Sequence, residues 1–157
     1  MKTKHFTHLQ IGINAPGIEA KDQEGNPISL KNFKGKKVIL YFYPKDDTPG
    51  CTAESCNLRD NYNLLLKQGY IVIGVSNDDE KSHKKFIKKY NLPFSLIADT
   101  DKKVVNDYGV WGNKTFMGRE FMGIVRTTFV ISKRGKIEKI ITEVDNKNHT
   151  AQLLEGN

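Results

Sequence analysis

The sequence contains few cysteines and no long apolar run, and each shortage excludes a class of protein. Two cysteines among 157 residues are too few for the disulfide framework of a small secreted domain. No apolar stretch approaches the ~20 residues that a membrane-spanning helix requires. The basic residues at the N-terminus are not followed by the apolar core of a secretory signal. We therefore expect a cytoplasmic protein without a membrane partner.

The cysteines and histidines also lack the spacing of a metal site. The two cysteines form no C-x-x-C and the four histidines no H-x-x-x-H pattern, so no zinc site is expected. Glycines at positions 109, 112, 118 and 123 do not form a G-x-G-x-x-G after a strand. They predict a flexible loop, with Trp111, Phe116 and Phe121 at a pocket mouth or covering the core. We expect neither a metal nor another cofactor.

The charge is strongly basic, with a formal net charge of +7. Such a balance can mark a nucleic-acid partner, but the only dense run of lysines lies within residues 81–90. In that run Phe86, Ile87 and Tyr90 share one helical face and the lysines occupy the other. The run therefore predicts an amphipathic surface helix, and we expect no nucleic-acid partner.

The order of predicted elements indicates an α/β fold. Continuous apolar runs at 38–43 and 70–76 are typical of strands that are buried on both faces. The other expected elements are a hairpin region at 16–35 with its turn at 25–27, helices at 48–67, 81–90 and 101–108, a strand at 94–98, a hairpin at 124–132 and 136–142, and a helix from about 148. We expect one domain, residues 1–157, with a mixed central sheet, helices on both faces and an N-terminal β-hairpin.

One cysteine lies at a predicted helix start. Thr48 fits the N-cap position, Pro49 is N1, Gly50 is N2 and Cys51 is N3. The unpaired N–H groups and the helix dipole at this end favour a thiolate, which is the reactive form of cysteine. A buried structural cysteine is the alternative, but it explains poorly a thiol after Pro-Gly in a polar segment. Cys51 is therefore a candidate nucleophile.

The pattern Pro44-x-x-x-Thr48-x-x-Cys51 resembles the active-site motif of the peroxiredoxins. Further segments resemble their bacterioferritin comigratory protein (PrxQ) branch, and the likeness covers nearly the whole chain; the segments are 48–52, 58–60, 109–112 and 122–129. The resemblance implies a thioredoxin-like fold and a monomer. It also implies a thiol peroxidase that reduces hydrogen peroxide and organic hydroperoxides to water and alcohols, with thioredoxin as the reductant.

The resemblance also implies roles for four residues. Cys51 would be the peroxidatic nucleophile, the Thr48 hydroxyl would contact the thiolate and the bound peroxide, Pro44 would wall the pocket, and Arg126 would lie beside the cysteine. Simpler interpretations exist for three of them. Thr48 could only cap the helix, Pro44 could only end the preceding strand, and Arg126 could be a solvent-exposed charge at a strand end.

A cation beside Cys51 also has a physical justification. Asp46, Asp47 and Glu54 are near in sequence, and their charges would oppose thiolate formation if they were close in space. The guanidinium of Arg126 would offset them and stabilise charge on the departing oxygen. Glu54, three residues after Cys51, could share its helical face and orient the arginine; alternatively it is a solvated carboxylate.

Cys56 has two interpretations. Five residues along a helix give about 7.5 Å of rise and about 140° of rotation, which separates the two cysteine Cα atoms by roughly 8–9 Å. A disulfide tolerates only about 7 Å, so a Cys51–Cys56 bond requires the helix to unwind. Cys56 is thus either a bystander or a resolving cysteine that acts after unwinding, and the resemblance implies the second.

Two other functions use the same thiols. A redox sensor or holdase would use the thiol switch to expose a binding surface, and it would be oxidised once without turnover. A disulfide reductase of the thioredoxin type is disfavoured because the C-x-x-C motif is absent.

Overall fold

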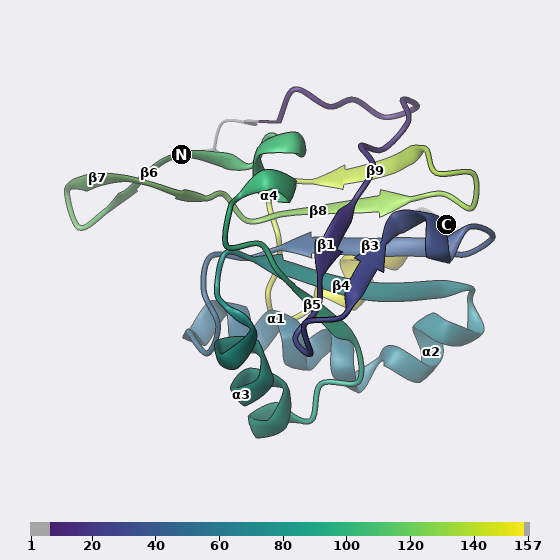
Figure 1. Cartoon of the computed structure of the whole chain (residues 1–157), viewed down its shortest axis with the longest axis horizontal. Coiled ribbons are helices and arrows are strands. Elements are labelled where there is room, and N and C mark those ends of the chain that lie inside the picture. Colours follow the sequence, from purple (N-terminus) through teal and green to yellow (C-terminus); the bar gives the residue numbers. More distant parts are fainter. Residues whose placement is uncertain (1–6, 156–157) are drawn as a thin grey trace.

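A five-stranded mixed sheet forms the centre of the protein (Figure 1). The structure is a computed structural model that describes residues 7–155. The strands are β3 (Lys37–Phe42), β4 (Tyr70–Ser76), β5 (Ser95–Ala98), β8 (Thr127–Ile131) and β9 (Ile137–Ile141), in the order β5-β4-β3-β8-β9. Strands β3, β4 and β5 are parallel, whereas β8 is antiparallel to β3 and to β9. The predicted mixed sheet is therefore confirmed.

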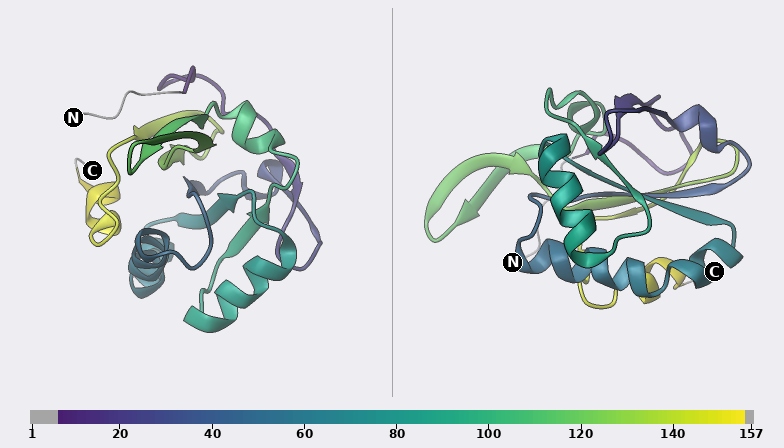
Figure 2. Two further views of the ribbon diagram at one scale, coloured as in Figure 1. Left: turned by 90° about the vertical axis from the view of Figure 1, so that its left-hand side faces the viewer. Right: turned by 60° about the horizontal axis from the view of Figure 1, so that its bottom comes forward.

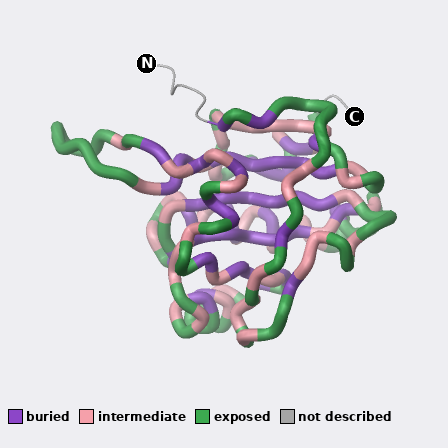
Figure 3. The backbone as a smooth tube through the Cα atoms, turned by 45° about the horizontal axis from the view of Figure 1, so that its top comes forward, coloured by how far each residue is buried: buried purple, intermediate pink, exposed green. Residues whose placement is uncertain are grey.

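Helices cover both faces of this sheet, as expected. Side chains alternate along β3, so Ile39 and Tyr41 enter one apolar cluster while Leu40 and Phe42 enter the other. The first cluster lies under α1 (Pro49–Asp60), α2 (Tyr62–Lys67), α3 (Glu80–Tyr90) and α5 (His149–Leu154). The second lies under α4 (Lys103–Asp107), the 3₁₀ helix η1 (Leu30–Phe33) and the hairpin of β1 (Glu19–Lys21) and β2 (Pro27–Ser29). The right-hand view of Figure 2 shows the two layers, and Figure 3 shows that the strands between them are buried.

Two local predictions at turns are informative. The N-terminal hairpin is confirmed, with Gly25 at a positive φ of 77° in its turn. The helix expected at 48–67 is interrupted: α1 ends at Asp60 and α2 begins at Tyr62. At the break the Asn61 side chain donates to the Asn57 carbonyl (2.8 Å), which competes with the regular backbone ladder.

The prediction of a flexible loop around residues 109–123 is wrong. Strands β6 (Trp111–Phe116) and β7 (Arg119–Ile124) pair along their whole length, and the hairpin projects from the sheet (Figure 1). Met117 and Gly118 both have positive φ, the geometry of a tight two-residue hairpin turn. Phe116 is 68% exposed and Phe121 46% exposed, so neither covers the core, whereas Trp111 is half-buried and packs against it.

Among residues 7–155, no helix combines the length and the apolar character that crossing a bilayer would require.

Candidate active site

Cys51 lies in the first turn of α1, where the sequence predicted it. The helix begins at Pro49, directly after the loop that leaves the carboxyl end of β3. Thr48 has the extended backbone of an N-cap residue (φ −94°, ψ 155°), and Cys51 is fully buried. The thiol therefore lies near the first-turn N–H groups, at the positive end of the helix dipole.

The Thr48 side chain does not cap this helix. Its hydroxyl donates to the Lys45 carbonyl (2.9 Å) and makes no hydrogen bond to the first turn. The expectation of a capping hydroxyl is therefore wrong, although the residue occupies the N-cap position. Because the hydroxyl hydrogen is used by a carbonyl, the oxygen keeps its lone pairs and can still accept a hydrogen bond from another group.

Arg126 reaches Cys51 because of the strand register. It precedes β8, whose first residue, Thr127, pairs with Phe42 at the end of β3. Its Nη2 donates to Cys51 Sγ (3.1 Å) and its Nη1 to Glu54 Oε1 (2.6 Å). Burial opposes the charge, yet the contacts with Glu54 and Cys51 raise the pKa of Arg126. The arginine is thus a fixed cation beside the thiol and not a solvated strand-end charge.

Glu54 is buried beside this arginine. Its side chain has no exposed surface, so it is not a solvated helix carboxylate. Burial raises the pKa of Glu54 to about 7, although the charge and hydrogen bond of Arg126 act in the opposite direction. Its second oxygen, Oε2, lies 3.4 Å from His149 Nε2 and has no hydrogen-bond partner among residues 7–155.

Gly50 lets polar groups approach the helix start. A Cβ atom at this position would lie 3.0 Å from Asn146 Nδ2 and 3.3 Å from Arg126 Nη2. Lys114, on the projecting hairpin, donates to the Ile124 carbonyl (2.8 Å). Burial and the nearby Arg126 lower the pKa of Lys114, whereas Cys51 raises it. Asn146 and Arg126, both distant in sequence, therefore lie close to the first turn of α1.

Pro44 and Cys56 lie further from these contacts. Pro44 is half-buried in the loop after β3. Cys56 is half-buried on α1, and both cysteines are free. Because α1 is continuous from residue 49 to 60, this is the reduced state with the helix intact. Burial raises the pKa of Cys56, partly opposed by Arg59, so this thiol is protonated at neutral pH.

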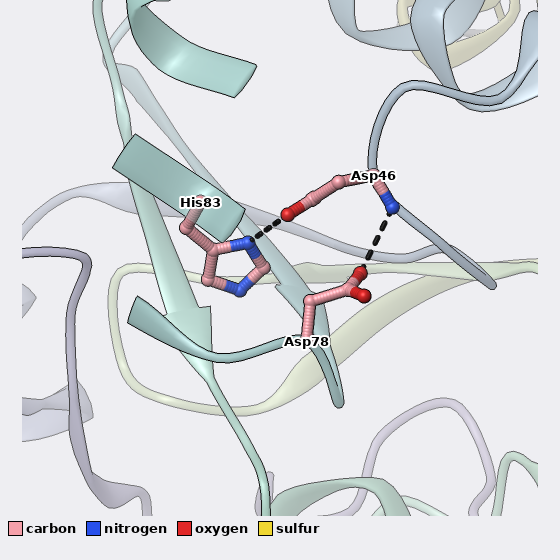
Figure 4. Close-up of side chains that lie close together, drawn as sticks. All are labelled: Asp46, Asp78 and His83. Atoms are coloured by element: carbon pink, nitrogen blue, oxygen red, sulfur yellow. Dashed lines mark hydrogen bonds and ion pairs between the residues drawn. The ribbon is translucent and has the colours of Figure 1, made fainter. Parts of the chain in front are cut away.

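The two aspartates of the loop before α1 pair with residues of α3, His83 and Lys89, and Figure 4 shows Asp46 beside His83. Asp46 accepts from Tyr43 Oη (2.6 Å) and Ser82 Oγ (2.8 Å) and pairs with His83 Nδ1 (2.7 Å). His83 Nε2 faces the Ile97 carbonyl (2.8 Å), which can only accept, so Nε2 carries a hydrogen. Burial opposes protonation of His83, but Asp46 outweighs it and raises the pKa. Asp47 is held separately by Lys89 and Tyr90.

The side chains of Asp46, Asp78 and His83 are of the types that bind metals, but their donor atoms already take part in hydrogen bonds. Donor atoms of Asp46, Asp78 and His83 lie within 4.8 Å of one another. Both imidazole nitrogens are occupied, and Asp78 Oδ2 accepts from Ser76 Oγ and the Asp46 N–H. A cation would have to displace these hydrogen bonds and the imidazolium charge. We therefore assign the cluster as an ion-pair network that fixes the loop before α1.

Among the described residues, His83 and His149 are buried, and neither was predicted from the sequence as part of the site. His83 is three residues before Phe86 and seven before Tyr90, so its helical spacing already placed it on the apolar face of α3. His149 opens the short terminal helix α5, and no local pattern indicates that it lies against Glu54.

A buried, arginine-paired cysteine at a helix start beside a thioredoxin-like sheet defines the class of thiol peroxidases. Comparison with known proteins agrees: the model of the AhpC/TSA family matches residues 11–140. The chain belongs to this family and is a peroxiredoxin.

Several of the proteins similar to this chain are Bcp or PrxQ peroxiredoxins. The putative peroxiredoxin bcp of Coxiella burnetii is 46% identical over 146 residues, which cover 93% of this chain and 97% of the relative. Peroxiredoxin Bcp of Bacillus subtilis is 43% identical, with 94% of each chain covered. A solved PrxQ mutant from Xylella fastidiosa matches with a TM-score of 0.88 at 28% identity, again over 94% of each chain.

Proposed function

We propose that Cys51 is the peroxidatic cysteine of a two-cysteine peroxidase. Its thiolate attacks one peroxide oxygen, the O–O bond breaks, and the other oxygen leaves as water or an alcohol after taking a proton. The sulfur is oxidised to a sulfenic acid. The observation that carries this proposal is the 3.1 Å contact between Arg126 Nη2 and the Sγ of a fully buried Cys51.

Three other residues act on the same step. Arg126 stabilises charge on the departing oxygen, where a fixed donor is most effective. Thr48 accepts a hydrogen bond from the peroxide hydroxyl with its unshared lone pairs, and Pro44 limits water around the sulfur. Glu54 holds the second arm of the Arg126 guanidinium and so fixes its direction.

Cys56 then resolves the sulfenic acid. Its thiol condenses with the Cys51 sulfenic acid, which forms an intramolecular disulfide and releases water. The intact α1 keeps the two residues too far apart for this bond, so its first turns unwind before resolution. The raised pKa of Cys56 supports these separate roles of the two cysteines, because a protonated thiol does not compete with Cys51 for the peroxide.

A dithiol reductant of the thioredoxin type returns the pair to thiols by exchange. The substrates we propose are hydrogen peroxide and alkyl hydroperoxides; the Bcp of Xanthomonas campestris, whose solved structure matches with a TM-score of 0.83, is described by its alkyl peroxide reduction activity. We propose a monomeric single-domain enzyme of the cytoplasm, where reducing conditions keep both cysteines free.

Two cysteine variants test the proposal. Cys51→Ser should abolish peroxide consumption, and sustained turnover by this variant would refute the mechanism. Cys56→Ser should consume one equivalent of peroxide at the parent rate but fail to recycle with thioredoxin. If Cys56→Ser cycles normally with thioredoxin, Cys56 is a bystander.

A mass measurement tests the intermediate directly. After one equivalent of peroxide and without reductant, the monomer should lose the mass of two hydrogens, which corresponds to an internal disulfide. A gain of one oxygen that persists would instead show that the sulfenic acid is not resolved within the chain.

A further inference from the structure

The β6–β7 hairpin exposes its large apolar side chains and partly buries a lysine. The exposed side chains are 46% to 85% accessible to solvent, and they are Phe116, Met117, Phe121 and Met122. Lys114, in the middle of β6, is half-buried. A lysine usually keeps its ammonium in water, because burial of a charge is costly unless the charge has a partner. A sequence that departs from this rule indicates a functional position.

A glycine makes space for this lysine. Lys114 pairs with Phe121 across the two strands, so its side chain lies on the same face of the hairpin as position 123, two residues along β7. A Cβ atom at Gly123 would lie 3.2 Å from Lys114 Cδ, closer than the 3.4 Å at which ordinary van der Waals contact begins. The lysine side chain therefore runs over Gly123 to the base of the hairpin, where its Nζ donates to the Ile124 carbonyl (2.8 Å).

The base of the hairpin adjoins the Cys51 site. Ile124 ends β7, and Arg126 lies between it and β8, which begins beside the carboxyl end of β3. Helix α1 follows β3 and so begins at this same end of the sheet, beyond which the hairpin projects (Figure 1). The ammonium of Lys114 therefore lies on the side of the sheet end where Arg126 contacts the Cys51 thiol.

Ionisation of Cys51 supplies a counter-charge for this lysine. Arg126 already forms an ion pair with Glu54. Among residues 7–155, the Ile124 carbonyl is the only hydrogen-bond or ion-pair partner of Lys114. With a neutral thiol, these side chains thus carry two positive charges and at most one negative charge. Loss of the Cys51 proton reduces this excess, and a half-buried charge is less costly when it has a counter-charge.

The interaction between the lysine and the cysteine is mutual. Burial and the charge of Arg126 lower the pKa of Lys114, whereas Cys51 raises it. Because the energy between two charges is the same whichever of them titrates, Lys114 favours the Cys51 thiolate to the same extent. The hydrogen bond to the Ile124 carbonyl stabilises the charged form of the lysine, so the cation is present when the thiol ionises.

We propose that Lys114 is a positioning residue for the peroxidase reaction: from the base of the hairpin, its ammonium supplies a second positive charge that favours the Cys51 thiolate. This inference rests on the proposed role of Cys51 as nucleophile. It gives the projecting hairpin a function in the active site and adds one cation to the charge of Arg126.

The other titratable groups near Cys51 come from α1, β3, α5 and the loop before α1. Burial raises the pKa of Glu54 to about 7. Burial also raises the pKa of Tyr41 well above its ordinary value, so this phenol is neutral, and it lowers the pKa of His149 to about 4, so this imidazole is neutral at pH 7. Asp46 pairs with a histidine of α3. Of these groups, Glu54 is the one whose titration must be separated from that of the thiol.

The pH dependence of Cys51 alkylation by iodoacetamide, measured with Cys56→Ser protein, tests the proposal. Lys114→Met keeps an unbranched side chain but removes its charge, so the pH midpoint of alkylation should rise by roughly 0.5–1 unit. Lys114→Gln also removes the charge but keeps a hydrogen-bond donor, and it should raise the midpoint by a similar amount. Lys114→Arg keeps the charge and should return the midpoint to within about 0.3 unit of the parent value.

Arg119→Met is the matched control. It removes one positive charge from the same hairpin, but Arg119 is exposed and lies next to the turn, where it pairs with Phe116. Salt screens exposed charges beyond about 10 Å, so the midpoint should stay within about 0.2 unit of the parent value. Equal shifts for Arg119→Met and Lys114→Met would be an effect of net charge and would overturn the proposal. If Lys114→Gln keeps the parent midpoint, the lysine only braces the hairpin, and the proposal is again overturned.

Repeating the comparison with Glu54→Gln protein separates the lysine from the carboxylate. This background removes the group that titrates near pH 7, and Lys114→Met should still raise the midpoint. A shift that disappears there would show that Lys114 acts through the titration of Glu54 and not on the thiolate, which overturns the proposal. Alkylation requires no peroxide, so a parent protein without peroxidase activity would refute the proposed function and leave this result intact.

Discussion

The titration of Glu54 should be visible in the stability of the protein. Glu54 has a pKa of about 7 in the folded protein and an ordinary value of 4.5, which we take for the unfolded chain. The folded state therefore holds the Glu54 proton more tightly. Its contribution to stability is complete below pH 4.5 and is lost as the pH rises to about 7. Glu54→Gln does not titrate and loses nothing across this window.

The size of the effect follows from the width of the window. About 2.5 pH units separate the two pKa values, and each unit corresponds to ~1.4 kcal/mol. Between pH 4.5 and 7 the free energy of unfolding of Glu54→Gln should therefore gain roughly 3 kcal/mol relative to the parent. Because Glu54 has no exposed surface, solvent screening does not reduce this value substantially.

His149 also affects how the stability of the parent protein depends on pH. Its pKa is lowered from 6.5 to about 4, so the folded state binds its proton less tightly, and stability falls as the pH drops from 6.5 to 4. Between pH 4.5 and 6.5 the two residues have opposite slopes. The contributions of this pair should nearly cancel in the parent, and Glu54→Gln should expose the acid sensitivity of His149.

The assay is urea unfolding at a series of pH values under reducing conditions. Both proteins carry Cys51→Ser, so that thiol titration does not contribute, and the difference between their free energies of unfolding is plotted against pH. A difference curve that is flat between pH 4.5 and 7 would refute the assignment of Glu54 as a buried acid.

Three further substitutions test other contacts. Arg126→Lys keeps the charge but loses the fork that reaches both the thiol and Glu54, so the rate constant for peroxide reduction should fall roughly 100-fold in stopped-flow assays; a fall below threefold contradicts this role. Asn57→Ala removes the hydrogen bonds that connect α1 to the Lys147 carbonyl and the Thr150 N–H. If these bonds restrain unwinding of α1, disulfide formation after one equivalent of peroxide should accelerate roughly tenfold, as followed by quenched mass spectrometry. An unchanged rate would show that they do not restrain it. His83→Leu leaves the buried Asp46 carboxylate with its hydrogen bonds from Tyr43 and Ser82 but without its imidazole partner. Urea unfolding at neutral pH should show a loss of about 3–5 kcal/mol, and a loss under about 1 kcal/mol contradicts the ion pair.

The central sheet could be predicted because its strands carry their own signal. Residues 38–43 and 70–76 are continuously apolar, and a strand buried between two helical layers must be so. The hairpin β6–β7 has no such signal, since most of its side chains face solvent. Its glycines at 112 and 123 pair directly across the two strands, a contact that linear spacing does not reveal.

The residues of the candidate site also differ in whether the sequence alone could locate them. Cys51 could be located from the sequence because the feature that favours its thiolate, a helix start at Pro49, is local. Arg126 is 75 residues away, and only the resemblance to the peroxiredoxins indicated its position. His149 had neither signal: its position beside Glu54 depends on α5 packing against α1 near Asn57, a tertiary contact that no short pattern encodes.

Oxidation and helix unwinding are coupled through Arg126. In the reduced protein the guanidinium contacts α1 twice, at Cys51 in its first turn and at Glu54 in its second, so the contact that favours the thiolate also holds the helix start. Conversion of the thiolate to a neutral sulfenic acid removes the charge-assisted bond to sulfur, which is about twice as strong as a neutral one. The loss falls on the turn that must unwind, while Asn57 still anchors the next part of the helix to α5. We therefore expect unwinding to start at Pro49 and to progress toward Cys56, and hydrogen exchange in the Cys56→Ser sulfenic acid should increase first at residues 50–54. Earlier exchange at residues 57–60 would show that the helix opens from its other end.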